Sequence, residues 1–239
     1  MLAAFLWGGL AASSLLIGYL LARRELRNRT IGLVMGFGAG ALISAISYEL
    51  VPESNIRGWI TIVALLGGAL VFFAADWAVD RQGGAHRKAV AGGEAPGSGA
   101  AVFIGTVLDN IPESAVLGMG LAIGGSISVA FLVAVFVSNL PEGVAGTVNL
   151  VAVGRSRRGI LWLWIAVVLV SAGSAALGYG LIRLLPGADG SIAQAFAAGA
   201  MLTMLADAMM PEAYQHGGKM AGIATVLGFV TAAALSVVS

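Results

Sequence analysis

The sequence predicts an all-α, polytopic membrane protein with eight transmembrane helices, on two observations. Of its 239 residues, 59% are hydrophobic and only 10% are charged, whereas soluble domains carry about 25% charged residues. The apolar residues gather in eight stretches, each near the roughly 20 residues that cross a bilayer. These stretches are residues 2–22, 31–53, 58–80, 100–123, 126–153, 159–184, 190–213 and 218–238.

The first stretch predicts a membrane span with its N-terminus outside the cell membrane, because an arginine cluster follows it and no basic residue precedes it. The orientation satisfies the positive-inside rule. The Lys and Arg residues in the resulting cytoplasmic segments are Arg23, Arg24, Arg27, Arg29, Arg81, Arg87, Lys88, Arg155, Arg157, Arg158 and Lys219. Only Arg57 and Arg183 fall outside. Eight spans then place the C-terminus outside as well.

The whole chain, residues 1–239, is predicted to form one transmembrane domain. Helices 1–3 occupy about 2–80, the central helices 4 and 5 about 100–153, and helices 6–8 about 159–238. Residues 81–99 between helices 3 and 4 are rich in Gly and Ala. Because such a composition cannot bury enough apolar surface to order itself, a flexible cytoplasmic linker is expected there.

An internal repeat predicts how the helices are arranged. Residues 36–54 align without gaps on 195–213, with identical pairs Phe37/Phe196, Gly40/Gly199, Pro52/Pro211 and Glu53/Glu212. The two stretches cross the membrane in opposite directions, so they are inverted copies. Together with the motifs described next, this indicates a 3+2+3 arrangement, in which a pseudo-two-fold axis relates helices 1–3 to 6–8. Composition alone explains the shared small residues, but it does not explain the recurrence of Pro-Glu.

The fourth and fifth stretches carry two near-copies of one motif, Asp-Asn-Ile-Pro-Glu-Ser at 109–114 and Ser-Asn-Leu-Pro-Glu-Gly at 138–143. A carboxylate inside a membrane span is costly, so it indicates a functional site by default. The first and fifth residues of each motif share one helix face, and each proline frees a backbone carbonyl. We therefore predict a cation site with the candidate ligands Asp109, Asn110, Glu113, Ser138, Asn139 and Glu142.

The residue types limit the chemistry of that site. The chain has no cysteine and only two histidines, which excludes thiolate ligands and disulfides. Oxygen donors suit Mg²⁺, Mn²⁺ and Fe²⁺, and carboxylates also admit Zn²⁺. Binding to carboxylates would release protons and couple occupancy to pH. Two alternatives stay open: Asn110 and Asn139 serve as interhelical packing groups, and Asp109 lines the inner exit.

At these residues the chain resembles the ZIP (Zrt/Irt-like) divalent metal transporters, which have eight spans, both termini outside and a 3+2+3 arrangement. The motif at 109–114 resembles the family's His-Asn-x-Pro-Glu-Gly, and 138–142 its His-Glu-x-x-x-Glu. The resemblance implies that Asn110, Glu113, Asn139 and Glu142 bind metal in a binuclear-type centre and that metal moves toward the cytoplasm. Asp109 and Ser138 replace the family's histidines, which should favour ions harder than Zn²⁺.

Further acidic residues lie toward the ends of the spans. Glu49 and Glu53 fall at the outer end of helix 2, where they either gather cations or are solvated at the headgroup level. Asp76 on helix 3, and Asp207 and Glu212 on helix 7, approach the cytoplasm and predict an exit path. Acidic residues at both mouths favour a transporter of zinc, iron or manganese that works by alternating access. The alternative is a membrane metal sensor or assembly subunit that binds without transport.

Other function classes fit less well. The paired carboxylates could serve an intramembrane enzyme as acid and base, but the sequence has no Gly-x-Gly-Asp or His-Glu-x-x-His pattern and no cysteine, so no enzymatic activity is expected. We expect the metal as substrate, no organic cofactor and no nucleic-acid partner. Faces rich in Gly and Ala, such as Gly36-x-x-x-Gly40, allow a homodimer but are equally needed within one subunit.

Overall fold

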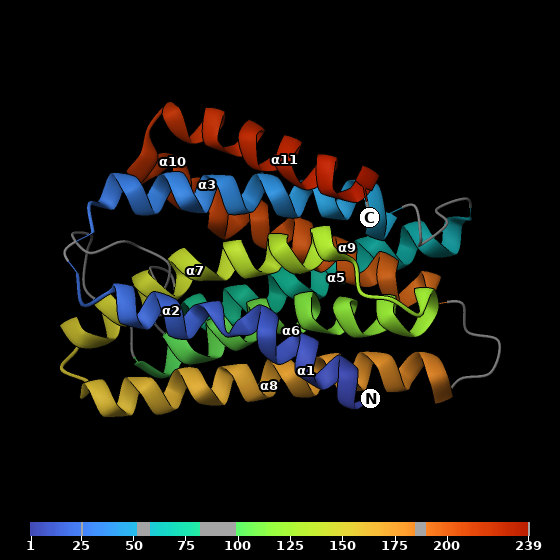
Figure 1. The fold of residues 1–239 in the computed structure, drawn as a ribbon, viewed down its shortest axis with the longest axis horizontal. Coiled ribbons are helices and arrows are strands. Elements are labelled where there is room, and N and C mark those ends of the chain that lie inside the picture. The colour runs from blue at the N-terminus through green and yellow to red at the C-terminus, as the bar shows by residue number, and fades with distance from the viewer. Residues whose placement is uncertain (25, 52–57, 82–98, 185–189, 239) are drawn as a thin grey trace.

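The protein is a bundle of helices in the computed structural model (Figure 1). The structure describes residues 1–24, 26–51, 58–81, 99–184 and 190–238, so Glu53 and residues 82–98 of the expected linker lie outside it. No strand occurs among the described residues. The elements are α1 (Leu2–Ala12), α2 (Ser14–Leu21), α3 (Asn28–Ala45), η1 (Ile46–Leu50), α5 (Trp59–Val79), α6 (Gly99–Gly124), α7 (Val129–Ala152), α8 (Arg157–Leu184), α9 (Ser191–Met204), η3 (Leu205–Met209), α10 (Met210–Gly217) and α11 (Met220–Val238).

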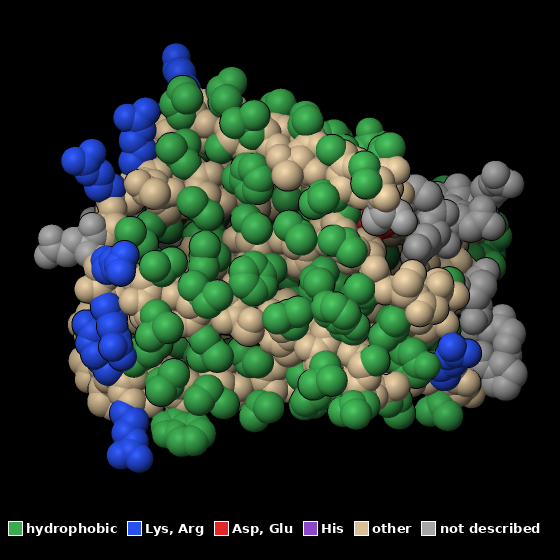
Figure 2. Space-filling model, viewed as in Figure 1, with side chains coloured by type: hydrophobic (Ala, Val, Ile, Leu, Met, Phe, Trp, Pro, Cys, Tyr) green, Lys and Arg blue, Asp and Glu red, His purple; other side chains and the backbone are tan. Residues whose placement is uncertain are grey.

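The all-α class is confirmed, and the helices are compatible with a polytopic membrane protein. Seven helical runs in the described part of the chain are long and apolar enough to cross a membrane. The other long helix, α6, has 26 residues and contains Asp109 and Glu113. Hydrophobic side chains cover the middle of the molecule, while Lys and Arg gather at the left end in Figure 2. Both termini lie toward the opposite end in Figure 1.

The ends of two helical runs differ from the sequence-based boundaries. The second run begins at Asn28 rather than at residue 31. The seventh continues through α10 to Gly217, although residue 213 was the expected end. Pro211 lies two residues after the π-helical segment η3, inside the continuous run Ser191–Gly217, and does not stop it. Pro112 and Pro141 likewise lie inside the continuous helices α6 and α7.

Two short π-helical segments occur at matching places in the sequence repeat. η1 spans Ile46–Leu50 and η3 spans Leu205–Met209, so both ends differ by 159 residues. This is also the offset between 36–54 and 195–213. Because π-helical turns are rare and occur often at functional sites, the two copies share a specific backbone feature as well as a sequence pattern.

The same two copies make similar close contacts with other helices. α3 packs against α11, and α9 packs against α5. In these two pairs, four glycines lie so close to a carbonyl oxygen of the partner helix that a Cβ atom would overlap it: Gly40 with Thr225, Gly228 with Phe37, Gly199 with Leu65, and Gly68 with Phe196. Small residues allow this backbone approach in membrane helices. The aligned residues of the repeat therefore occupy similar packing environments.

Candidate metal centre

All six predicted ligands lie on α6 and α7 and are buried inside the bundle. Their exposed fractions are 1% for Asp109, 1% for Asn110, 2% for Glu113, 2% for Ser138, 1% for Asn139 and 8% for Glu142. Polar groups at membrane depth normally face the protein interior, because lipid cannot satisfy them. The candidate ligands therefore face the interior of the bundle rather than its surface.

The two motifs meet at their asparagines. Asn139 Nδ2 donates a hydrogen bond to Asn110 Oδ1 over 3.1 Å, although 29 residues separate them in sequence. Asn110 Nδ2 in turn donates to the backbone oxygen of Thr106 over 3.0 Å. This interhelical bond is what the packing interpretation of the asparagines predicts. It does not exclude metal binding, since an amide oxygen has a second lone pair.

Ser138 lies at a close contact between α3 and α7. A Cβ atom on Gly38 of α3 would be 2.8 Å from the Cα atom of Ser138. The Ser138 hydroxyl donates to the backbone oxygen of Val135 over 2.9 Å, which leaves its oxygen lone pairs as acceptors. Ser138 is thus both a close packing residue and a neutral oxygen donor beside the asparagine pair.

The carboxylates alone do not form a metal-binding cluster in this conformation. Within the described residues, no three His, Cys, Asp or Glu side chains are grouped so that they could hold one metal ion. Asp109 and Glu113 come from α6, and Glu142 comes from α7. A cation bound here would therefore need asparagine, serine or backbone oxygens in addition to carboxylates, which is a donor set for hard ions.

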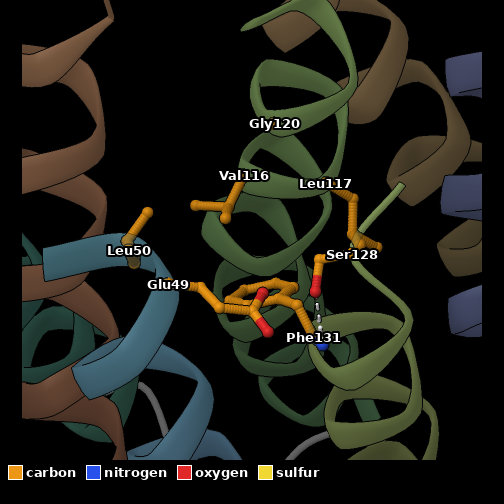
Figure 3. A pocket seen from close by; sticks show the side chains of 7 residues that line it. All are labelled: Glu49, Leu50, Val116, Leu117, Gly120, Ser128 and Phe131. Atoms are coloured by element: carbon orange, nitrogen blue, oxygen red, sulfur yellow. Dashed lines mark hydrogen bonds between the residues drawn. The ribbon is translucent and has the colours of Figure 1, made fainter. Parts of the chain in front are cut away.

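Glu49 lines a small cavity beside the part of α6 that follows the motif (Figure 3). The cavity has a volume of about 30 Å³, which is enough for one or two water molecules. Its lining includes Leu117, four residues after Glu113, and Phe131 and Ser128 at the start of α7. Glu49 Oε1 also accepts a hydrogen bond from Ser236 Oγ over 2.7 Å. Glu49 is therefore half-buried and hydrogen-bonded to the last helix of the bundle.

The acidic residues of the predicted exit path have different environments. Asp76 is buried on α5, whereas Asp207 is exposed on η3. Glu212 on α10 pairs with His216 one turn later, with 3.3 Å between Oε2 and Nδ1. His216 belongs to the last turn of α10. Because the run extends to Gly217, His216 and Glu212 share one helix face.

Two further contacts near the motifs could not be expected from the sequence. Trp164 of α8 is fully buried, and its Nε1 donates to Thr147 Oγ1 over 2.8 Å. The Thr147 hydroxyl donates to the backbone oxygen of Gly143 over 2.6 Å, directly after Glu142. The hydrogen bond from Ser236 to Glu49 likewise joins two residues far apart in the sequence. A buried indole N–H needs an acceptor, but nothing in the sequence identifies which one.

Comparison with known proteins does not place the chain in a family. No family model matches it, and no curated protein matches it either. Its functional interpretation therefore depends on the motifs, their burial and the contact between α6 and α7.

Proposed function

We propose that the protein is a divalent-cation transporter of the ZIP type in the cell membrane. The observation that carries the proposal is the hydrogen bond between Asn139 and Asn110, which brings two Asn-x-Pro-Glu motifs together inside the bundle. Burying carboxylates this deeply among apolar helices costs free energy, so their presence indicates a functional site. The bound ion would be held by carboxylate, amide and hydroxyl oxygens, a donor set that favours Mn²⁺ or Fe²⁺ over a histidine-selected Zn²⁺.

The proposed architecture is the 3+2+3 arrangement with inverted repeats. Support comes from the two π-helical segments at equivalent repeat positions and from the similar glycine contacts of α3 with α11 and α9 with α5. The proposed topology has both termini outside. Its support is the gathering of Lys and Arg at one end of the molecule, opposite the termini (Figures 1 and 2), which agrees with the positive-inside rule.

The proposed path runs from the cavity beside Glu49 to the motifs and then toward Asp76, Asp207 and Glu212. Leu117 and Phe131 line this cavity, and both are almost completely buried. In the proposed mechanism, these side chains move when a cation passes from the cavity to the centre, as alternating access requires. Transport toward the cytoplasm is proposed from the family resemblance.

Uptake into proteoliposomes tests this function. Vesicles loaded with a metal-sensitive dye would receive Mn²⁺, Fe²⁺, Zn²⁺, Co²⁺, Cd²⁺ or Mg²⁺ in turn. We expect uptake of at least one transition metal by the wild type and none by Glu113→Gln/Glu142→Gln, which retains side-chain size but removes the charges. The control is Thr61→Val, which alters a buried polar side chain on α5, outside the motifs.

The outcome also separates the transporter from the sensor. If the folded wild type binds a transition metal but passes none across the membrane, the transporter proposal is wrong and the sensor or assembly subunit is favoured. If neither binding nor uptake depends on Glu113 and Glu142, the location of the site is wrong.

A further inference from the structure

A large apolar groove lies between two tightly packed helix pairs, α5 with α9 and α6 with α8. Its volume is about 1090 Å³. Residues that line it include Phe72 of α5, Ile111 and Pro112 of α6, Leu177 of α8 and Phe196 of α9. Among the described residues of the lining, Ser174 alone carries a polar side chain. Water has too few polar partners to fill such a space.

The groove follows from the packing of the two helix pairs. Within one pair, a Cβ atom on Gly118 would overlap the carbonyl oxygen of Ala175. Within the other, a Cβ atom on Gly199 would overlap that of Leu65. Each pair is therefore at its closest spacing, and the lining between the pairs includes several small residues, such as Ala115, Ala193 and Ala197. Small side chains on fixed backbones leave the space between the pairs unfilled.

The equivalent place in the other sequence copy is packed shut. There, α3 contacts α7 directly, with a Cβ atom on Gly38 only 2.8 Å from Ser138 Cα. Gly38 corresponds to Ala197 in the alignment of 36–54 with 195–213. The groove is therefore a feature of one side of the bundle rather than a general consequence of small residues.

The groove opens sideways onto the hydrophobic surface of the protein. Several lining residues are also exposed on that surface, with exposed fractions of 72% for Leu177, 76% for Leu184, 54% for Ile192 and 57% for Val71. The surface around them consists of the helices that are apolar enough to cross a membrane. The groove is thus continuous with the part of the protein that meets the bilayer, where acyl chains are the solvent.

We propose that one acyl chain of a bilayer phospholipid occupies this groove. Along α6 the lining extends from Leu108 to Met119, about 16 Å at 1.5 Å per residue. One leaflet of a hydrocarbon core of about 30 Å is roughly 15 Å deep, so the groove matches the length of one leaflet's chains. Met1, at the N-terminus, and Gly190 also line the groove. We therefore expect the lipid to come from the leaflet nearest the N-terminus. The proposal does not depend on metal transport.

Photo-crosslinking tests the occupant. The wild type would be placed in nanodiscs of phosphatidylcholine that carries a diazirine at the end of one acyl chain, and adducts would be mapped by mass spectrometry. We expect adducts on buried residues of the groove, such as Ala200, which is only 5% exposed. The matched control position is Ala41, its repeat equivalent, which is 3% exposed and is not part of this groove's lining. Adducts confined to exposed surface residues, or equal at both positions, would overturn the proposal.

A groove-filling variant gives a second measurement. Ala200→Phe adds a ring inside the groove, and native mass spectrometry should show at least a threefold loss of co-purified phospholipid relative to the wild type. Leu169→Phe, on an exposed part of α8 outside the groove, should retain the lipid. Retention of the lipid by folded Ala200→Phe, or crosslinks from the groove to a second copy of the chain, would show that an acyl chain is not the occupant. If Ala200→Phe does not fold, the wild-type adducts decide.

Discussion

The hydrogen bond between Asn139 and Asn110 can be tested by a double-mutant cycle. The variants are Asn110→Ala, Asn139→Ala and the double substitution, unfolded reversibly in mixed detergent micelles with a metal chelator present. Each single substitution leaves the other amide buried without its partner, which should cost about 1–3 kcal/mol. The double variant should be less unstable than the sum of the single variants, because the partner that the first substitution stranded is also removed.

The expected coupling energy follows from the geometry. The bond is direct, at 3.1 Å, and both residues are 1% exposed. Interhelical hydrogen bonds in membranes contribute about 0.6 kcal/mol on average and up to about 1.7 kcal/mol. At about 1.4 kcal/mol per tenfold change, the coupling corresponds to roughly a 3- to 16-fold change in the unfolding constant. Coupling energies smaller than about 0.3 kcal/mol, the level of additivity for independent sites, would refute the contact between the motifs.

Repeating the cycle with metal separates packing from coordination. A ligand that binds only the folded protein stabilises it by about 2.7 kcal/mol at a hundred times its dissociation constant. If the asparagines bind the metal, each single variant should lose most of this increment. If they serve only as packing groups, the variants should start from a lower stability but gain as much from the metal as the wild type. The second result would remove both asparagines from the proposed ligand set.

Three further predictions concern packing and the cavity beside Glu49. Gly199→Ala should destabilise the protein by about 1–3 kcal/mol, since its Cβ would overlap a backbone oxygen; Gly222→Ala, which meets nothing within 4 Å, should be neutral or stabilising in thermal unfolding. Trp164→Phe should cost about 1 kcal/mol by removing the indole N–H donated to Thr147, and an unchanged melting temperature would argue against that bond. Glu49→Gln should slow metal uptake several-fold without weakening equilibrium binding at the central motifs; equal uptake by both proteins would exclude Glu49 from the path.

Composition and apolar periodicity predicted the helical class and the positions of the apolar helices, and the motifs at 109–114 and 138–143 indicated a candidate site. The helical class and the helix positions follow from composition and from the length of apolar stretches, because both are properties of a single stretch of sequence. The aligned stretches 36–54 and 195–213 contain the two π-helical segments, but the alignment does not indicate their geometry. Hydrogen-bond registers of that kind depend on packing, which a single stretch does not specify.

Which side chains meet follows only from how the helices pack against one another. The tertiary structure placed Asn139 against Asn110 and Ser236 against Glu49, contacts that join residues far apart in the sequence. It also left a groove on one side of the bundle while the related place at Gly38 is closed. Repeated sequences predict equal packing on both sides, and the difference between them arises because packing depends on the distances between whole helices rather than on the residues of either helix alone.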